Sequence, residues 1–111
     1  MLNTNGYVAE CTGDNIFIIK DNVLKTPALY HGVLEGITRN LVLEIGNELG
    51  LKSEETTITR FDLFNSDECF VTGTAAEIVP VISIDKNVIK DGKPGKITRK
   101  INEIYRKRIM N

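Results

Sequence analysis

The fold is set by the stretch Asn15-Ile16-Phe17-Ile18-Ile19-Lys20-Asp21-Asn22-Val23-Leu24-Lys25-Thr26 of this 111-residue chain. Residues 15–20 and 23–26 are rich in β-branched and aromatic side chains, which favour strands. Asp21 and Asn22 between them favour a tight turn. Pro27 cannot donate a hydrogen bond to a neighbouring strand, so we expect the second strand to end before it. The stretch predicts two consecutive strands joined by a turn.

Working outward, residues 6–10 predict a further strand that forms a hairpin with residues 15–20, because Thr12-Gly13-Asp14 between them favours a turn. Residues 37–49 predict a helix, since their apolar positions recur every three or four residues. Gly50 follows where a helix commonly ends. The apolar positions of this helix are Ile37, Leu41, Val42, Ile45 and Leu49.

The second half of the chain predicts alternating short elements and a final amphipathic helix. In chain order we expect a strand at 54–59, a short helical turn at 59–64, a strand at 68–72, a loop at 73–77, extended structure at 78–84, a Gly/Pro linker at 92–95 and a helix marked by Ile97, Ile101, Ile104, Tyr105 and Ile109. The predicted fold class is mixed α/β (α+β).

The amino-acid composition limits the classes of function that the chain could have. With 41% hydrophobic and 26% charged residues, the chain has enough apolar side chains for one core. Its 14 basic and 15 acidic residues are well mixed, so neither nucleic acid nor an anionic membrane is an expected partner. A basic cluster at 99–108 lies in the last predicted helix, and is either a solvated helix end or a binding patch. The longest apolar runs have the length of strands and are too short to span a membrane.

The two cysteines, Cys11 and Cys69, have no CxxC spacing and follow no signal peptide. This usage favours reduced thiols and a cytoplasmic location. With a single histidine, His31, no zinc cluster is recognisable, and the metal prediction is none. A lone histidine in a loop is more often exposed than catalytic.

Two features suit a flat, charged cofactor. Glu10 stands at the end of a predicted strand, where it either faces a cleft or is simply exposed. Gly36-Ile37-Thr38 begins the first predicted helix, whose free N–H groups favour a phosphate, although Thr is also an ordinary capping residue. A carboxylate and a phosphate site together match pyridoxal phosphate, which carries a protonated ring nitrogen and a phosphate.

A third candidate is the run Gly73-Thr74-Ala75-Ala76 between two predicted strands. Its small residues and hydroxyl would let the backbone approach a ligand and let N–H groups surround an anion. A plain β-bulge would explain the same residues.

Together these residues resemble the class IV, fold-type IV, pyridoxal phosphate enzymes, in order and in spacing. The positions that carry the resemblance are Glu10, Thr12, Asn15-Ile16-Phe17, Leu24, Thr26, Leu34, Gly36-Ile37 and Arg39. Within that group the chain is similar to the branched-chain amino acid aminotransferases. The segments that carry this second likeness are residues 6–15, Leu34-Glu35-Gly36-Ile37-Thr38-Arg39, Gly73-Thr74-Ala75-Ala76-Glu77 and Asp91-Gly92-Lys93-Pro94-Gly95.

The resemblance implies a role for each site residue. Glu10 would pair with the protonated ring nitrogen, and Leu34 would pack on the ring. The N–H groups of Ile37 and Thr38, with the hydroxyls of Thr38 and Thr74, would hold the phosphate. The backbone of Thr74 and Ala75 would receive the substrate carboxylate. Gly36 and Gly73 complete the expected set of cofactor-binding residues.

The family's cofactor-linking lysine lies some thirty-odd residues before the glutamate, whereas nine residues precede Glu10 here. No lysine of the chain matches it, so the expected catalytic residues within the chain are none. We therefore expect residues 1–111 to be the C-terminal part of the pyridoxal phosphate-binding large domain, folded as part of a pseudo-barrel of mixed strands with flanking helices. Alone, this part should be inactive and should be poorly soluble or oligomerise.

The implied function is transfer of an amino group between leucine, isoleucine or valine and 2-oxoglutarate, in a homodimer or higher homo-oligomer. One alternative is a relative that acts on D-amino acids or cleaves aminodeoxychorismate. Another is a noncatalytic module that binds pyridoxal phosphate or phosphate without turnover.

Overall fold

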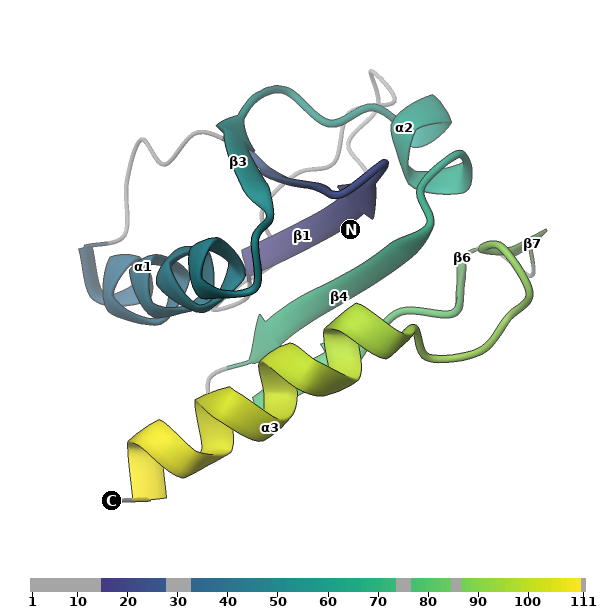
Figure 1. Cartoon of the computed structure of the whole chain (residues 1–111). Coiled ribbons are helices and arrows are strands. Elements are labelled where there is room, and N and C mark those ends of the chain that lie inside the picture. Colours follow the sequence, from purple (N-terminus) through teal and green to yellow (C-terminus); the bar gives the residue numbers. More distant parts are fainter. Residues whose placement is uncertain (1–14, 28–32, 74–76, 85–86, 111) are drawn as a thin grey trace.

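The structure is a computed structural model that describes residues 15–27, 33–73, 77–84 and 87–110. A five-stranded sheet runs through its centre, in the order β3-β2-β1-β4-β5, and helices flank it (Figure 1). The elements are β1 (Asn15–Lys20), β2 (Val23–Thr26), α1 (Val33–Glu48), β3 (Lys52–Glu55), α2 (Arg60–Phe64), β4 (Glu68–Gly73), β5 (Glu77–Pro80), β6 (Ser83–Ile84), β7 (Asn87–Val88) and α3 (Lys96–Met110). The predicted mixed α/β class is confirmed.

The turn between β1 and β2 has the geometry that its two residues favour. Asp21 and Asn22 both have positive φ angles, of 51° and 65°. A two-residue hairpin turn of this kind matches the twist of antiparallel strands, and Asp and Asn tolerate the left-handed region better than most residues. The strands pair Lys20 with Val23 directly across it. The tight turn predicted between residues 15–20 and 23–26 is confirmed, and β2 ends at Thr26, before Pro27. The strand predicted at 6–10, and its hairpin with residues 15–20, lie outside the described residues.

Helix α1 connects two parallel neighbours, β2 and β3. It ends as predicted around Gly50, whose φ is +87°. The Gly50 N–H donates to the Asn47 carbonyl at 3.0 Å, and the Leu51 N–H donates to the Gly46 carbonyl at 2.9 Å. This pair of bonds is the Schellman motif, which satisfies carbonyls at the helix end. The chain then turns directly into β3.

The predicted strand at 54–59 is wrong in position, because β3 is Lys52–Glu55. The Lys52 N–H donates to the Asn22 carbonyl at 3.2 Å, which fixes the start of the strand beside the β1–β2 turn. All four side chains of β3 are exposed, so the strand carries no alternation of apolar and polar residues. Pairing with β2, and not the pattern of its own side chains, sets its limits.

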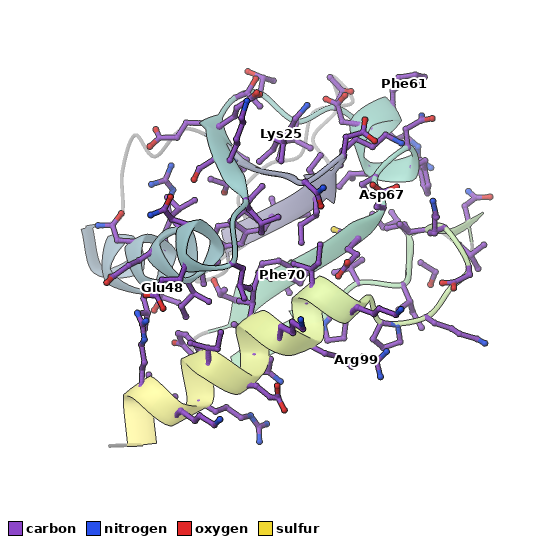
Figure 2. The ribbon with its side chains drawn as sticks, viewed as in Figure 1. Lys25, Glu48, Phe61, Asp67, Phe70 and Arg99 are labelled. Carbon is purple, nitrogen blue, oxygen red and sulfur yellow. The ribbon has the colours of Figure 1, made fainter. Side chains whose placement is uncertain are left out.

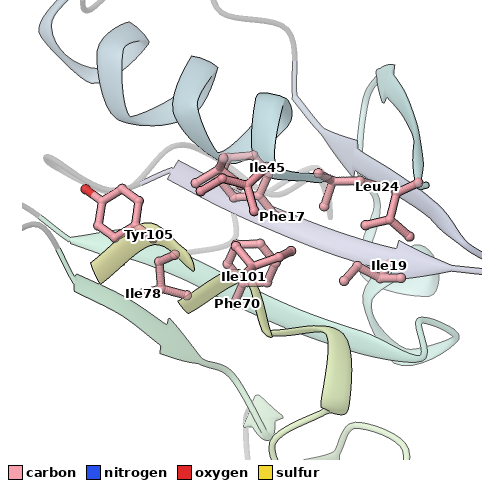
Figure 3. Close-up of a cluster of buried hydrophobic side chains, with 10 residues drawn as sticks. Phe17, Ile19, Leu24, Ile45, Phe70, Ile78, Ile101 and Tyr105 are labelled. Carbon is pink, nitrogen blue, oxygen red and sulfur yellow. The ribbon is translucent and has the colours of Figure 1, made fainter. Parts of the chain in front are cut away.

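Two clusters of apolar side chains cover the two faces of the sheet. Side chains alternate along β1, so Phe17 and Ile19 join one cluster while Ile16 and Ile18 join the other. Helices α1 and α3 cover the first face, where the Phe17 and Phe70 rings stack with centroids 5.0 Å apart (Figure 3). Residues of α2 and of the segment around β6 and β7 cover the second face.

The predicted helical turn at 59–64 is confirmed as α2. Thr59 caps it, since its hydroxyl accepts from the Asp62 N–H at 3.1 Å and its own N–H donates to the Asp62 carboxylate at 2.9 Å. This reciprocal arrangement is a capping box. The extended structure predicted at 78–84 is split, because β5 ends at Pro80 and β6 belongs to a separate two-stranded sheet with β7.

Helix α3 confirms the predicted C-terminal helix. Ile101 and Tyr105 of the expected apolar face are almost fully covered, whereas Ile109 near the C-terminus is exposed. The basic cluster of α3 lies on the exposed side. Arg108 forms ion pairs with Glu44 and Glu48 of α1, which link the two helices on the surface. Glu48 lies on the side of α1 that faces α3 (Figure 2). Within the described residues, no helix is both long enough and apolar enough to span a membrane.

Candidate functional site

The segments that carry the predicted site residues all join the sheet at one end. Strand β1 begins there with Asn15, which pairs with Thr72, and β4 ends one residue later at Gly73. Strands β2 and β3 also end there, where Thr26 pairs with Glu55. We call this end of the sheet the Thr26 end, and define it by Asn15, Thr26, Glu55 and Gly73.

Helix α1 starts near the same end and runs away from it, since Leu51 and Lys52, just after the helix, lie beside the turn at the opposite end of the sheet. The Thr26 end therefore gathers the start of β1, the ends of β2, β3 and β4, and the first turns of α1. A binding site built from loops on a rigid sheet has this kind of layout.

Several predicted site residues lie outside the described residues, namely Glu10, Thr74 and Ala75, as do Cys11, Thr12 and His31. The described residues next to them are Asn15, Pro27, Val33, Gly73 and Glu77, of which Gly73 and Glu77 pair with each other between β4 and β5. The roles predicted for Glu10, Thr74 and Ala75 stay predictions.

The start of α1 differs from the prediction. We expected the helix to begin at Gly36-Ile37-Thr38, but it begins at Val33. Nothing in residues 33–36 forbids helix, since a glycine such as Gly36 lowers helix stability by only about 1 kcal/mol and is tolerated when the rest of the helix packs well. The predicted start is therefore wrong by four residues.

This difference bears on the predicted phosphate site. The N–H groups without a partner inside a helix are those of its first four residues. Ile37 and Thr38 come after these four positions in α1, and Leu34 and Gly36 lie within them. Thr38 is half-buried. The phosphate-holding role of Ile37 and Thr38 stays a prediction.

Arg39 is a buried cation near the Thr26 end. In the sequence it is one of the positions that carry the family resemblance, but no role at the site was predicted for it. It is 4% exposed, and its Nη2 lies 3.0 Å from Oε1 of Glu55, the last residue of β3. Nε and Nη2 are buried and lack a partner in hydrogen-bond geometry. A buried guanidinium is costly unless a counter-charge and hydrogen bonds satisfy it. The spacing of 39, 42 and 46 along α1 puts Arg39 on the buried face with Val42, and that signal could have indicated its burial from sequence.

Two threonines supply buried hydroxyls at the same end. The Thr26 hydroxyl donates to the Ile16 carbonyl at 2.7 Å and so ties β2 to β1. Thr72 is 2% exposed, and its hydroxyl has no hydrogen-bond partner. Buried polar atoms are nearly always paired in folded proteins. The unpaired atoms of Arg39 and Thr72 could therefore form hydrogen bonds with polar groups other than those of the described residues, such as those of a ligand.

The opposite end of the sheet carries a surface hollow near Lys93 and the start of α3. Its helix N-terminus is already satisfied, because the Glu68 carboxylate accepts from the N–H groups of Ile97 and Thr98 at 3.2 and 2.7 Å. The N-terminus of α3 is therefore not free to bind a ligand there. Among the described residues, no group of three or more His, Cys, Asp or Glu side chains could hold a metal ion.

Cys69 does not belong to the site. It faces the second cluster and is 3% exposed, and burial raises the pKa of its thiol to about 12. A thiol reacts through its thiolate, so Cys69 is a packing residue.

This burial predicts how Cys69 reacts. In a Cys11→Ser background, alkylation of Cys69 by iodoacetamide at pH 7.5 should be about 1000-fold or more slower in the folded protein than in denaturant, because the pKa leaves little thiolate. Mass spectrometry of timed samples measures both rates. Similar rates in the two conditions would show that Cys69 is accessible and would contradict its placement.

Comparison with known proteins assigns the class. A family model described as amino-transferase class IV matches residues 1–84. The chain therefore belongs to the amino-transferase class IV family, and solved structures of this family share its mixed sheet and flanking helices.

Within the family the chain is similar to branched-chain-amino-acid aminotransferases. It is 47% identical over 105 residues to that of Pseudomonas aeruginosa, covering 95% of this chain and 34% of the relative. A structure from Thermoproteus uzoniensis with norvaline is 49% identical, with a TM-score of 0.83 over 99% of this chain and 36% of that one. Another solved branched-chain amino acid aminotransferase, which contains pyridoxamine 5'-phosphate, is 40% identical, with a TM-score of 0.85 over 98% and 36%. The chain spans about a third of the length of the curated relatives it matches.

Proposed function

We propose that residues 1–111 form part of the pyridoxal phosphate-binding large domain of a branched-chain amino acid aminotransferase. The complete enzyme would move an amino group between leucine, isoleucine or valine and 2-oxoglutarate. By family the chain is part of a transaminase. Its substrates, its cofactor, a cytoplasmic location and a homodimeric or larger assembly belong to the proposal.

One observation carries the proposal. The described residues that flank Glu10, the segment before α1 and the Gly-Thr-Ala-Ala run all lie at the Thr26 end. A ligand at this end could therefore meet a carboxylate, a helix start and a small-residue loop together, which is what the resemblance requires. The similarity to branched-chain aminotransferases along more than nine tenths of the chain supports the same function over the D-amino acid and aminodeoxychorismate alternatives.

The described residues fit an anionic cofactor. Arg39 is buried with unpaired N–H groups, and the Thr72 hydroxyl is buried without a hydrogen-bond partner. The oxygens of a phosphorylated ring could supply hydrogen-bond partners to these groups at the Thr26 end. A relative's structure contains pyridoxamine 5'-phosphate, the amino form of this cofactor. Pyridoxal phosphate, when bound, supplies a ring that withdraws electrons from the substrate's Cα.

The residues of this chain would bind and orient that group. Glu10 would stay ionised and keep the ring nitrogen protonated, while Leu34 would pack against the ring face. Ile37, Thr38 and Thr74 would hold the phosphate, with Gly36 and Gly73 allowing close backbone approach. The N–H groups of Thr74 and Ala75 would hold the substrate carboxylate. Because no lysine of these 111 residues stands at the family's position, we expect these residues alone to be inactive.

A substrate panel tests the proposed function. The protein that contains these residues is incubated with pyridoxal phosphate and 2-oxoglutarate and with leucine, isoleucine, valine, D-alanine or aminodeoxychorismate in turn. L-glutamate is measured for the three branched-chain amino acids, and pyruvate is measured for D-alanine and aminodeoxychorismate. We expect glutamate with the three branched-chain amino acids. Turnover of D-alanine or aminodeoxychorismate alone would replace this function with one of the relatives' functions.

A further inference from the structure

We propose that Arg39 is an anion-binding residue of the Thr26 end, and that it holds an oxyanion, a carboxylate or a phosphate, in addition to its contact with Glu55. The proposal deepens the proposed function, on which it rests for the identity of the site. Its physical basis is the burial and incomplete pairing of one guanidinium.

The first step is charge. Arginine stays protonated at any physiological pH, so Arg39 carries its charge into an environment where it is 4% exposed. Glu55 is its ion-pair partner among the described residues, at 3.0 Å from Nη2. The Glu55 side chain is 55% exposed, so water solvates that carboxylate and weakens its compensation of the buried cation.

The second step is hydrogen bonding. Nε and Nη2 have no partner in hydrogen-bond geometry, although the second of them lies close to Glu55. These two nitrogens form one edge of the planar guanidinium, and their N–H groups point the same way. This edge matches the two oxygens of a carboxylate or phosphate in a bidentate arrangement, which neither a neutral carbonyl nor a water reproduces.

The third step is position. Arg39 is in the first half of α1 and contacts the last residue of β3, so its guanidinium lies where the Thr26 end meets the helix. The residue before it is Thr38, a predicted phosphate contact. An oxyanion at Arg39 would therefore belong to the same site as the ligand of the proposed function.

Four variants test the proposal by thermal unfolding in inorganic phosphate or in acetate, with sodium chloride added to keep ionic strength constant. The variants are Arg39→Gln, Arg39→Lys, Glu55→Gln and, as a control, Arg106→Gln, which changes an exposed cation of α3. A ligand that binds the folded state raises the melting temperature with its concentration, in a way that reports the dissociation constant. A general salt effect is neither site-specific nor altered by a single buried residue.

We expect at least one of the two anions to raise the melting temperature of the wild-type protein in a saturable way. The half-effect concentration is the anion concentration that gives half of the maximal rise. Arg39→Gln should raise the half-effect concentration at least tenfold. Arg39→Lys should raise it less, since lysine keeps the positive charge but lacks the two parallel N–H donors of the guanidinium. Glu55→Gln should lower it, because the competing carboxylate is gone. Arg106→Gln should match wild type.

A response to phosphate identifies a phosphate as the preferred group, and a response to acetate identifies a carboxylate. An unchanged half-effect concentration in Arg39→Gln, or in Glu55→Gln if the first variant does not fold, would overturn the proposal. The absence of any dependence on either anion in wild type would overturn it too. The probes are simple ions, so these outcomes are independent of whether the protein transaminates branched-chain amino acids.

Discussion

Glu10→Gln in the complete enzyme should lower the rate of transamination about 100-fold or more, while pyridoxal phosphate stays bound. The expected size follows from the proposed role of Glu10 as a fixed charge beside the ring nitrogen, where it would stabilise the transition state. Glutamine keeps the shape and a hydrogen-bonding oxygen but cannot hold a proton on the ring nitrogen by charge. The proposed phosphate contacts would come from other residues, so cofactor binding and the reaction rate should respond differently to the change.

Two measurements distinguish this effect from unfolding. The absorbance of bound cofactor after desalting should stay near the wild-type value, and glutamate formation from leucine and 2-oxoglutarate should fall. Glu103→Gln is the matched control, because Glu103 is an exposed carboxylate on α3 and its change should leave both quantities unaltered. Wild-type turnover in Glu10→Gln would remove Glu10 from the site.

Features that depend on neighbours in sequence could be predicted well. Asp21-Asn22 favours positive φ angles at two successive residues, and Gly50 favours one at a helix end, and both are found. Thr59 and Asp62 cap the short helix between them through bonds three residues apart. Each of these structures is stabilised by local backbone preferences and short-range hydrogen bonds, which the sequence contains in full.

Features set by distant partners could not be predicted. The limits of β3 depend on its pairing with β2 across the whole of α1, and its exposed side chains give no pattern. The start of α1 at Val33 needs no strong signal, because residues 33–36 are all compatible with helix and packing can extend it.

The site shows the same division. Candidate residues near one another in sequence, such as Gly36, Ile37 and Thr38, could be grouped from the sequence, and the topology explains why distant groups would meet at the Thr26 end. Arg39 was missed as a buried cation because its partner, Glu55, belongs to another element. Glu68 was likewise predicted only as a strand residue, although its side chain caps a helix 30 residues away.

The cap made by Glu68 gives the largest expected stability effect. Its carboxylate accepts from the Ile97 N–H, the Thr98 N–H and the Thr98 hydroxyl, at 3.2, 2.7 and 2.7 Å. These bonds satisfy the first turn of α3 and place a negative charge at its N-terminus. The side chain passes directly over Gly95, where an added Cβ would lie 2.0 Å from the Glu68 Cδ.

Gly95→Ala should therefore lower the free energy of unfolding by about 2 kcal/mol, since the methyl group displaces the carboxylate and α3 loses a charged cap. Urea or thermal unfolding followed by circular dichroism measures the change. Gly50→Ala is the control for a glycine effect alone: its φ is +87° but no atom lies within 4 Å of its Cβ position. It should lower stability by about 1 kcal/mol through backbone conformation.

A double-mutant cycle identifies the cause. Glu68→Ala alone should lower the free energy of unfolding by about 2 kcal/mol, because it removes the same cap. In that background the Cβ at position 95 meets no carboxylate, so adding Gly95→Ala should change stability by less than about 0.5 kcal/mol. If Gly95→Ala were equally destabilising with and without the Glu68 carboxylate, the loss would come from the backbone at position 95 and not from the cap. The coupling between positions 68 and 95 thus reports directly on whether a strand residue holds the start of α3.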